Sequence, residues 1–184
     1  GLQYENHGLD DILGDTYDNQ KKWVQNTTAI PSFDLNKFTF VNDKQRIPAA
    51  VVSLDLTLNR FATASGKRLF LSPNIMNKST IIPEKNDNRK SSIVLYPAFT
   101  DVDSISIEIS EKLYPEFIPE PVTIESVFGR YESKFILDQG QVVYIRKFVR
   151  NSGEFSADTY QDFVDFYKNI NKADNIKMVF VNKT

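Results

Sequence analysis

Residues 127–183, VFGRYESKFILDQGQVVYIRKFVRNSGEFSADTYQDFVDFYKNINKADNIKMVFVNK, decide the fold. Two runs with period-two alternation, 130–137 and 141–150, flank the turn DQGQ, in which Gly140 can take positive φ. An apolar stripe at helical spacing follows, made of Tyr160, Phe163, Val164, Tyr167 and Ile170. A last apolar run, 176–181, predicts a closing strand. The stretch therefore predicts a β-hairpin, a helix laid over one face of an antiparallel sheet, and a final strand.

The alternating pattern also runs through the middle of the chain. VVSLDLTLN (51–59) and DSISIEIS (103–110) each place apolar side chains on one face and polar ones on the other. This pattern is typical of half-buried antiparallel strands. NKFTFV (36–41) and KRLFLS (67–72) are the expected neighbours of the 51–59 strand, the second joined through the turn ASGK.

Apolar residues between Leu9 and Gln25 recur at roughly helical spacing and predict one N-terminal helix, although Gly14 interrupts it. We therefore expect a helical linker over residues 1–30. We expect a mainly β, antiparallel, sandwich-like domain over residues 31–184, with the C-terminal helix packed on the sheet. Residues 73–91 are polar and rich in proline, so a split between two subdomains is expected near there.

The composition is that of an ordinary globular protein. The 184 residues are 41% hydrophobic and 25% charged, with 22 basic and 24 acidic residues and a net charge of −2. No basic stripe would bind nucleic acid, and no apolar run is long enough to span a membrane. Cysteine is absent, which excludes disulfides and a cysteine nucleophile. The chain opens at Gly1 without a signal peptide, and we expect that a targeting signal was removed.

Several motifs occur together in the second half of the chain. An aromatic–Gly–x–Tyr strand precedes a Tyr–x–Arg strand, a tyrosine opens the helix, and Lys-Ala-Asp comes before the closing strand. These residues are Phe128, Gly129, Tyr131, Tyr144, Arg146, Tyr160, Lys172, Ala173 and Asp174. Together with ASGKRLFLSPN upstream, the pattern resembles the C-terminal β domain, a domain of unknown function, of transglutaminase-like proteins of Bacteroidetes-type bacteria. The resemblance covers roughly residues 35–182.

The resemblance implies a piece that follows a transglutaminase-like catalytic core. Such a core would supply Cys, His and Asp, whereas this chain has no Cys and one His. The resemblance also implies a periplasmic or cell-envelope location. We therefore expect no catalytic residue, no cofactor and no metal in this chain.

Three groups of polar residues could suggest chemistry, and each has a simpler explanation. His7 is a lone imidazole in a polar stretch, so we expect a surface residue. Asp101, Asp103 and Glu108 fall short of the six or more oxygens of a calcium site. A glycosidase-like carboxylate pair could be drawn from Asp55, Glu108 and Glu125, but all three lie on polar strand faces, where carboxylates are common.

Exposed aromatic residues are the remaining candidates for a functional surface. Trp23, Tyr96, Tyr114 and Phe117 lie outside the regular apolar patterns and could dock a neighbouring domain or stack on a glycan or peptide. Arg146 could contact a ligand, but we prefer an ion pair between its strand and the helix, which carries Asp158, Asp162 and Asp165.

Two functions therefore stay open at this stage. The first is a non-catalytic accessory domain that packs on or positions the catalytic core of a cell-envelope protein, with upstream domains of the same polypeptide as partners. The alternative is a glycan- or peptide-binding module that uses exposed aromatics.

Overall fold

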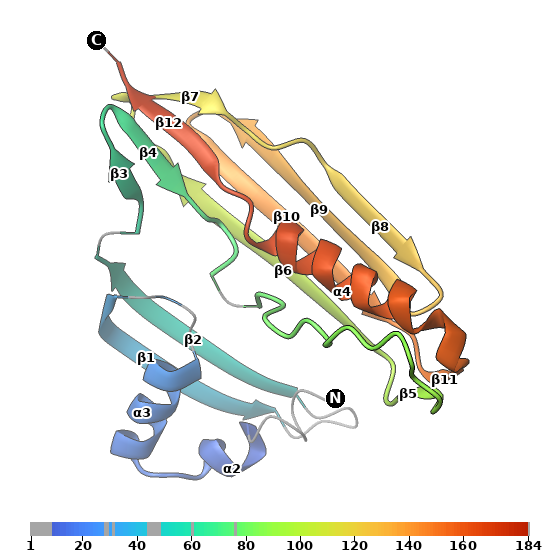
Figure 1. Ribbon diagram of the computed structural model, residues 1–184. Coiled ribbons are helices and arrows are strands. Elements are labelled where there is room, and N and C mark those ends of the chain that lie inside the picture. Colours follow the sequence, from blue (N-terminus) through green and yellow to red (C-terminus); the bar gives the residue numbers. More distant parts are fainter. Residues whose placement is uncertain are drawn as a thin grey trace. The chain divides into compact units, whose positions relative to one another are not determined.

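The computed structural model divides the chain into two compact units, unit 1 (Gly1–Phe61) and unit 2 (Ala62–Thr184) (Figure 1). It describes residues 9–27, 30, 32–43, 49–59, 61–75 and 77–183. All strand pairs in these residues are antiparallel, as the alternating sequence patterns predict. The predicted mainly β class, with helices near both ends, is confirmed.

In its described residues, unit 1 contains a β-hairpin and two short helices. Its elements are α2 (Leu9–Leu13), α3 (Tyr17–Thr27), β1 (Phe33–Asp43) and β2 (Ala49–Leu58). The predicted single helix is wrong, because the chain turns at Gly14 and Asp15 and forms two helices. The Asp15 carboxylate accepts a hydrogen bond from the Thr16 amide at 2.7 Å, directly before the start of α3.

Aromatic contacts join α3 to the hairpin. The Tyr17 ring stacks on Phe38 at 4.7 Å, and the Trp23 ring meets Phe40 edge-on at 5.6 Å. The described part of residues 1–30 is therefore packed within unit 1 together with β1 and β2, instead of forming a separate linker.

The boundary between the units lies at Phe61 and Ala62, upstream of the expected split at 73–91. Residues 73–91 lie inside unit 2, where they form most of the β4–β5 connection (residues 72–75 and 77–92). Polarity misled the sequence reading here, because the polar side chains of this connection bond to the sheet and helix of unit 2.

Unit 2 contains the remaining elements. Its strands are β3 (Thr63–Ser65), β4 (Arg68–Leu71), β5 (Ile93–Leu95), β6 (Phe99–Glu108), β7 (Leu113–Phe117), β8 (Val122–Ser126), β9 (Gly129–Asp138), β10 (Gln141–Arg150), β11 (Gly153–Phe155) and β12 (Met178–Asn182). Its helices are the short 3₁₀ turn η1 (Ala157–Thr159) and α4 (Tyr160–Asp174). Two four-stranded sheets form, in the orders β6-β10-β9-β8 and β3-β4-β12-β7, and β11 pairs with β5.

The first of these, the long sheet, is built around the predicted hairpin. β9 and β10 pair in unbroken register from Gln141–Asp138 to Arg150–Gly129. Gln139 and Gly140 close the turn with φ of 43° and 81°, and this pair of positive values is that of a type I′ turn, whose twist matches the flanking strands. The local sequence therefore sets the register of the central strands.

Helix α4 packs on one face of the long sheet, as the stripe predicts (Figure 1). Phe128 is fully buried at the centre of this contact, and its ring lies 5.0 Å from Phe163 and 4.8 Å from Phe155. The next residue, Gly129, has a φ of 152° and lies so close to the carbonyl of Val149 that a Cβ atom would collide with it. The Phe-Gly pair thus fixes the helix-covered end of the sheet.

The closing strand β12 belongs to the second sheet. It pairs with β4 on one side and β7 on the other. The predicted pairing of KRLFLS with the 51–59 strand is therefore wrong, because β4 bonds to β3 and β12 while β2 bonds to β1. One groove is lined both by Leu113, Pro115 and Phe180 of the second sheet and by Leu137 and Gly140 of the hairpin, so the two sheets meet there.

Substitution of Phe128 by Ala tests this core. We expect Phe128→Ala to lower the free energy of unfolding of unit 2 by about 3–5 kcal/mol, because it leaves a cavity among aromatic rings that cannot collapse. Val127→Ala is the matched control, since the neighbouring valine is exposed and should change stability by less than about 0.5 kcal/mol. Urea denaturation would measure both, and equal effects would contradict the proposed core.

Candidate functional site

Arg146 is the most unusual residue of the long sheet, because it is a buried charge on the apolar face. Alternation along β10 places it on the same side as Tyr144 and Phe148, and its side chain is 2% exposed. A guanidinium group out of water is unfavourable unless charged partners satisfy its donors. Arg146 is therefore not part of an exposed interaction surface, and the expectation that it could contact a ligand there is wrong.

The partner of Arg146 is Asp174, the last residue of α4. Arg146 Nε donates to Asp174 Oδ1 at 2.8 Å and Arg146 Nη2 donates to Oδ2 at 3.2 Å, in a two-pronged arrangement. The remaining nitrogen, Nη1, donates to Asp103 Oδ2 on β6 at 3.1 Å. The predicted ion pair between strand and helix exists, but its acid is Asp174 and not Asp158, Asp162 or Asp165.

Asp174 receives three further hydrogen bonds. The Tyr131 hydroxyl donates to Oδ1 at 2.8 Å, Asn74 Nδ2 donates to Oδ1 at 3.0 Å, and the Ser79 amide donates to Oδ2 at 2.7 Å. One carboxylate thus joins the end of α4, strands β9 and β10, and the β4–β5 connection.

The β4–β5 connection is held by amide side chains at other points as well. Asn77 Nδ2 donates to Asp103 Oδ1 at 2.6 Å, and Asn171 Nδ2 of α4 donates to the Ser79 carbonyl at 2.6 Å. The segment has no regular secondary structure, and side chains from the helix and the sheet satisfy its polar groups instead.

Burial and charge shift the ionisation of this cluster. Burial disfavours the charged form of Arg146, but the hydrogen bond and charge of Asp174 outweigh it, so its pKa is raised. Burial, reinforced by the nearby negative charge of Asp174, raises the pKa of Tyr131 to about 12. Burial also raises the pKa of Tyr144, whose hydroxyl lies 3.4 Å from that of Tyr131. Both tyrosines are therefore neutral at physiological pH.

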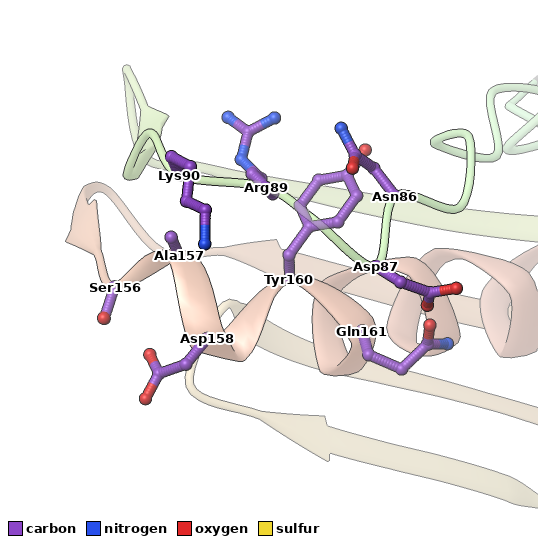
Figure 2. A pocket seen from close by; sticks show the side chains of 9 residues that line it. All are labelled: Asn86, Asp87, Arg89, Lys90, Ser156, Ala157, Asp158, Tyr160 and Gln161. Carbon is purple, nitrogen blue, oxygen red and sulfur yellow. The ribbon is translucent and has the colours of Figure 1, made fainter.

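A separate surface pocket of about 630 Å³ lies where the β4–β5 connection meets the start of α4 (Figure 2). Asn86, Asp87, Arg89 and Lys90 come from the connection, and Ser156, Ala157, Asp158, Tyr160 and Gln161 come from η1, α4 and the residue before them. These groups can form hydrogen bonds and ion pairs with a polar ligand.

The two largest side chains of this pocket are already engaged. The Arg89 guanidinium lies 4.6 Å from the centre of the Tyr160 ring, and it donates to the Ser91 and Ser92 carbonyls at 2.9 and 3.0 Å. The Tyr160 hydroxyl donates to the Glu84 carbonyl at 2.8 Å. Both residues hold the connection against the helix. Because Arg89 covers one face of the Tyr160 ring, a ligand could not stack on that face.

The four predicted aromatic residues are found in different settings. Trp23 is half-buried against Phe40 in unit 1. Tyr114 and Phe117, 59% and 50% exposed, lie together on β7, while Tyr96, 69% exposed, follows β5 at the opposite end of unit 2 (Figure 1). The members in unit 2 therefore do not form one aromatic platform, although two of them share strand β7.

The acidic candidates also separate. Glu108 and Glu125 lie on β6 and β8, the two opposite edges of the long sheet, while Asp55 accepts a hydrogen bond from Asn36 within unit 1. Asp103 is committed to Arg146 and Asn77. In the described residues no three His, Asp or Glu side chains are placed to hold a metal ion, and His7 lies outside them.

The sequence contained a signal for the Arg146–Asp174 pair that we did not use. Period-two alternation places Arg146 on the apolar face, and helical spacing from Ile170 places Asp174 on the apolar stripe of α4. Opposite charges on two faces that must pack together predict a buried ion pair. Asn74 and Ser79 gave no such signal, because their contacts depend on the path of an irregular segment.

Residues 67–180 match a family described as a domain of unknown function with a solved structure, DUF3858. The chain belongs to this family. The matched residues lie entirely within unit 2, so unit 2 contains the DUF3858 domain.

A solved structure shares the fold. It is a protein from Parabacteroides distasonis ATCC 8503 described as a "putative protease", which superposes with a TM-score of 0.52 at 15% sequence identity. The match covers 64% of this chain but 24% of that protein, so the chain spans about a quarter of its length. No curated protein matches the chain. None of the described helices is long and apolar enough to cross a membrane.

Neutralising Asp174 tests the buried pair. We expect Asp174→Asn to lower the free energy of unfolding of unit 2 by about 3–5 kcal/mol, because among the described residues it leaves the buried Arg146 with one acidic partner, Asp103. Asp165→Asn on the exposed side of α4 is the control and should cost less than about 0.5 kcal/mol. Equal stability of the two variants in urea would show that the pair contributes little.

Stability should also fall at alkaline pH. The ordinary tyrosine pKa is 10.0, whereas that of Tyr131 is raised to about 12, so between these values the unfolded chain loses its proton first. Stability is therefore full below about pH 10 and declines as pH rises to about 12, by about 1.4 kcal/mol per pH unit for each such group.

Tyr131→Phe separates this titration from general alkaline effects. The variant should be less stable at pH 8, because it lacks the hydrogen bond to Asp174, but its decline between pH 10 and 12 should be shallower. Tyr144 remains to titrate in both proteins. Parallel pH profiles of urea midpoints for the two proteins would contradict the assignment to Tyr131.

Proposed function

We propose that this DUF3858 domain is a non-catalytic accessory domain of a longer cell-envelope protein with a transglutaminase-like core, and that it packs on or positions that core. The family-like motif residues support this proposal, because they serve the fold. Phe128 fills the core, Tyr131 and Arg146 bond to Asp174, and Tyr160 opens α4. Side chains committed to such contacts stabilise a scaffold and are not available to a substrate.

The exposed aromatic pair on β7 carries the docking part of the proposal. Tyr114 and Phe117 lie on the edge strand of the second sheet, and large aromatic side chains on a surface are typical of sites that other protein surfaces cover. The transglutaminase-like partner and the cell-envelope location rest on the sequence resemblance. The small share of the Parabacteroides protein that is matched fits a domain attached to a larger protein.

Co-elution with the segment encoded upstream tests the proposal. The chain and that segment, expressed separately, should elute as one complex in size-exclusion chromatography. The double variant Tyr114→Ser/Phe117→Ser should raise the dissociation constant by about 30-fold, because aromatic anchors contribute about 2 kcal/mol or more to an interface.

Tyr96→Ser is the matched control, since Tyr96 is at least as exposed as the β7 pair but lies at the other end of unit 2. It should bind as the wild type does. Circular dichroism would verify that all variants are folded. The proposal fails if the two wild-type pieces elute separately, and the role of β7 fails if the double variant binds normally.

A further inference from the structure

The four outer strands of the two four-stranded sheets in unit 2 differ in how well they are protected against pairing with another strand. Such strands carry unpaired backbone groups, and proteins block them by shortness, proline, bulges or surface charge. β3 has three residues. β7 contains Pro115, and its pairing with β12 is irregular between Val179 and Phe180. β8 has five residues and follows Pro121, and its Glu125 is ion-paired with Arg130 at 2.7 Å.

β6 is neither short nor interrupted by proline or a bulge, and its one exposed charged side chain, Glu108, lies at the end of the strand. It has ten residues, FTDVDSISIE, without proline, glycine, lysine or arginine. It pairs with β10 in unbroken register from Phe99 to Glu108, and in the described part of the chain β10 is its sole strand partner. Its outward side chains are Thr100, Val102, Ser104, Ser106 and Glu108, with Val102 64% exposed. This edge is long, regular and rich in residues that favour strands.

An inward-facing charge can also block an edge, but here the charge at the centre of β6 is already compensated. Asp103 Oδ2 accepts from Arg146 Nη1 at 3.1 Å, and Asp103 Oδ1 accepts from Asn77 Nδ2 at 2.6 Å. Its carboxylate is directed to the interior of unit 2 and does not require water at the edge. A second strand beside β6 would therefore leave this ion pair intact.

We propose that β6 pairs antiparallel with β6 of a second copy of the chain, about a two-fold axis at Ser104. In this register Val102 lies opposite Ser106 of the other copy, and Thr100 lies opposite Glu108. On the inner face, Asp103 lies opposite Ile105 and Asp101 lies opposite Ile107. No like charges meet, because the three acidic residues, Asp101, Asp103 and Glu108, lie opposite the uncharged Ile107, Ile105 and Thr100.

Alternative registers explain why the axis is placed at Ser104. An axis at Asp103 would bring two Asp103 carboxylates face to face, and an axis at Val102 would place Asp101 opposite Asp103. Like charges directly opposite each other are unfavourable. An axis at Ile105 or farther along shortens the paired region to seven residues of β6 or fewer. The Ser104 register pairs nine residues and joins two four-stranded sheets into one eight-stranded sheet, within the usual size of sheets.

Sedimentation equilibrium of the chain tests this pairing. The mean mass should rise with concentration from that of one chain, 21.1 kDa, toward twice that value. Ser104→Lys places two ammonium groups opposite each other across the axis and should raise the dimer dissociation constant by about tenfold or more. Thr123→Lys is the matched control, because Thr123 is an exposed hydroxyl residue on β8, the other edge of the same sheet, and it should leave the dimer unchanged.

A charge-swap mixture tests the register itself. Ser104→Glu alone should weaken the dimer as Ser104→Lys does, whereas an equimolar mixture of the two variants should restore it, since Lys and Glu then face each other across the axis. Thermal unfolding of each variant would show that the fold is retained.

A mass that stays at 21.1 kDa over the whole concentration series would overturn the proposal and leave the edge to a strand of another protein. A dimer that both lysine variants weaken equally, or that the mixture fails to restore, would overturn it too. The pairing does not depend on the docking role proposed for β7, because it is measured on the chain without the upstream segment.

Discussion

The architecture of unit 2 depends on the ion pair and hydrogen bonds of one buried carboxylate, that of Asp174. It lies at the end of α4 and is bonded to Arg146 on β10, Tyr131 on β9, and Asn74 and Ser79 of the β4–β5 connection. A buried carboxylate requires such saturation, because an unpaired charge in the protein interior is strongly unfavourable. These bonds fix the position of the end of α4 on strands β9 and β10, and they fix the path of the β4–β5 connection beside it.

The arrangement also explains how unit 2 covers its long sheet. Up to Asp174, the C-terminal part of the chain is a helix that places Phe163, Phe166 and Ile170 over the sheet. After Asp174 it becomes β12, which brings the second sheet to the other end (Figure 1). The charge pair lies at this change from helix to strand. The candidate surfaces all lie outside this core, on β7, on the β6 edge and in the pocket at the start of α4.

The sequence predicted the parts of the fold that depend on neighbouring residues. Alternation and the Gln139-Gly140 turn were sufficient for the β9–β10 hairpin, and the stripe from Tyr160 to Ile170 was sufficient for α4. The pairing of β4 with β12 was not predictable in this way, because it joins residues more than a hundred positions apart. The path of the β4–β5 connection was missed for the same reason, since its amide side chains bond to partners that are distant in sequence.

The candidate surfaces were predicted less well than the fold. Tyr114 and Phe117 are exposed, whereas Arg146 is buried. The burial of Arg146 was not predicted, because an arginine on a strand is taken as a polar surface residue until the element packed against it is known to carry an acid. The sequence named the aromatic residues that lie outside regular patterns, and their role as an interaction surface stays a prediction. Their grouping depends on which strands form the edges, and the linear pattern does not contain that information.

Native-state hydrogen exchange at the Ser79 amide tests the central role of Asp174 most directly. Ser79 lies in a segment without regular structure, and its amide donates to Asp174 Oδ2 at 2.7 Å. We predict that this amide exchanges as slowly as those of the central strands β9 and β10, through global unfolding of unit 2. Exchange at the rate of an exposed loop would contradict the account, since the connection would then open independently of the buried charge pair.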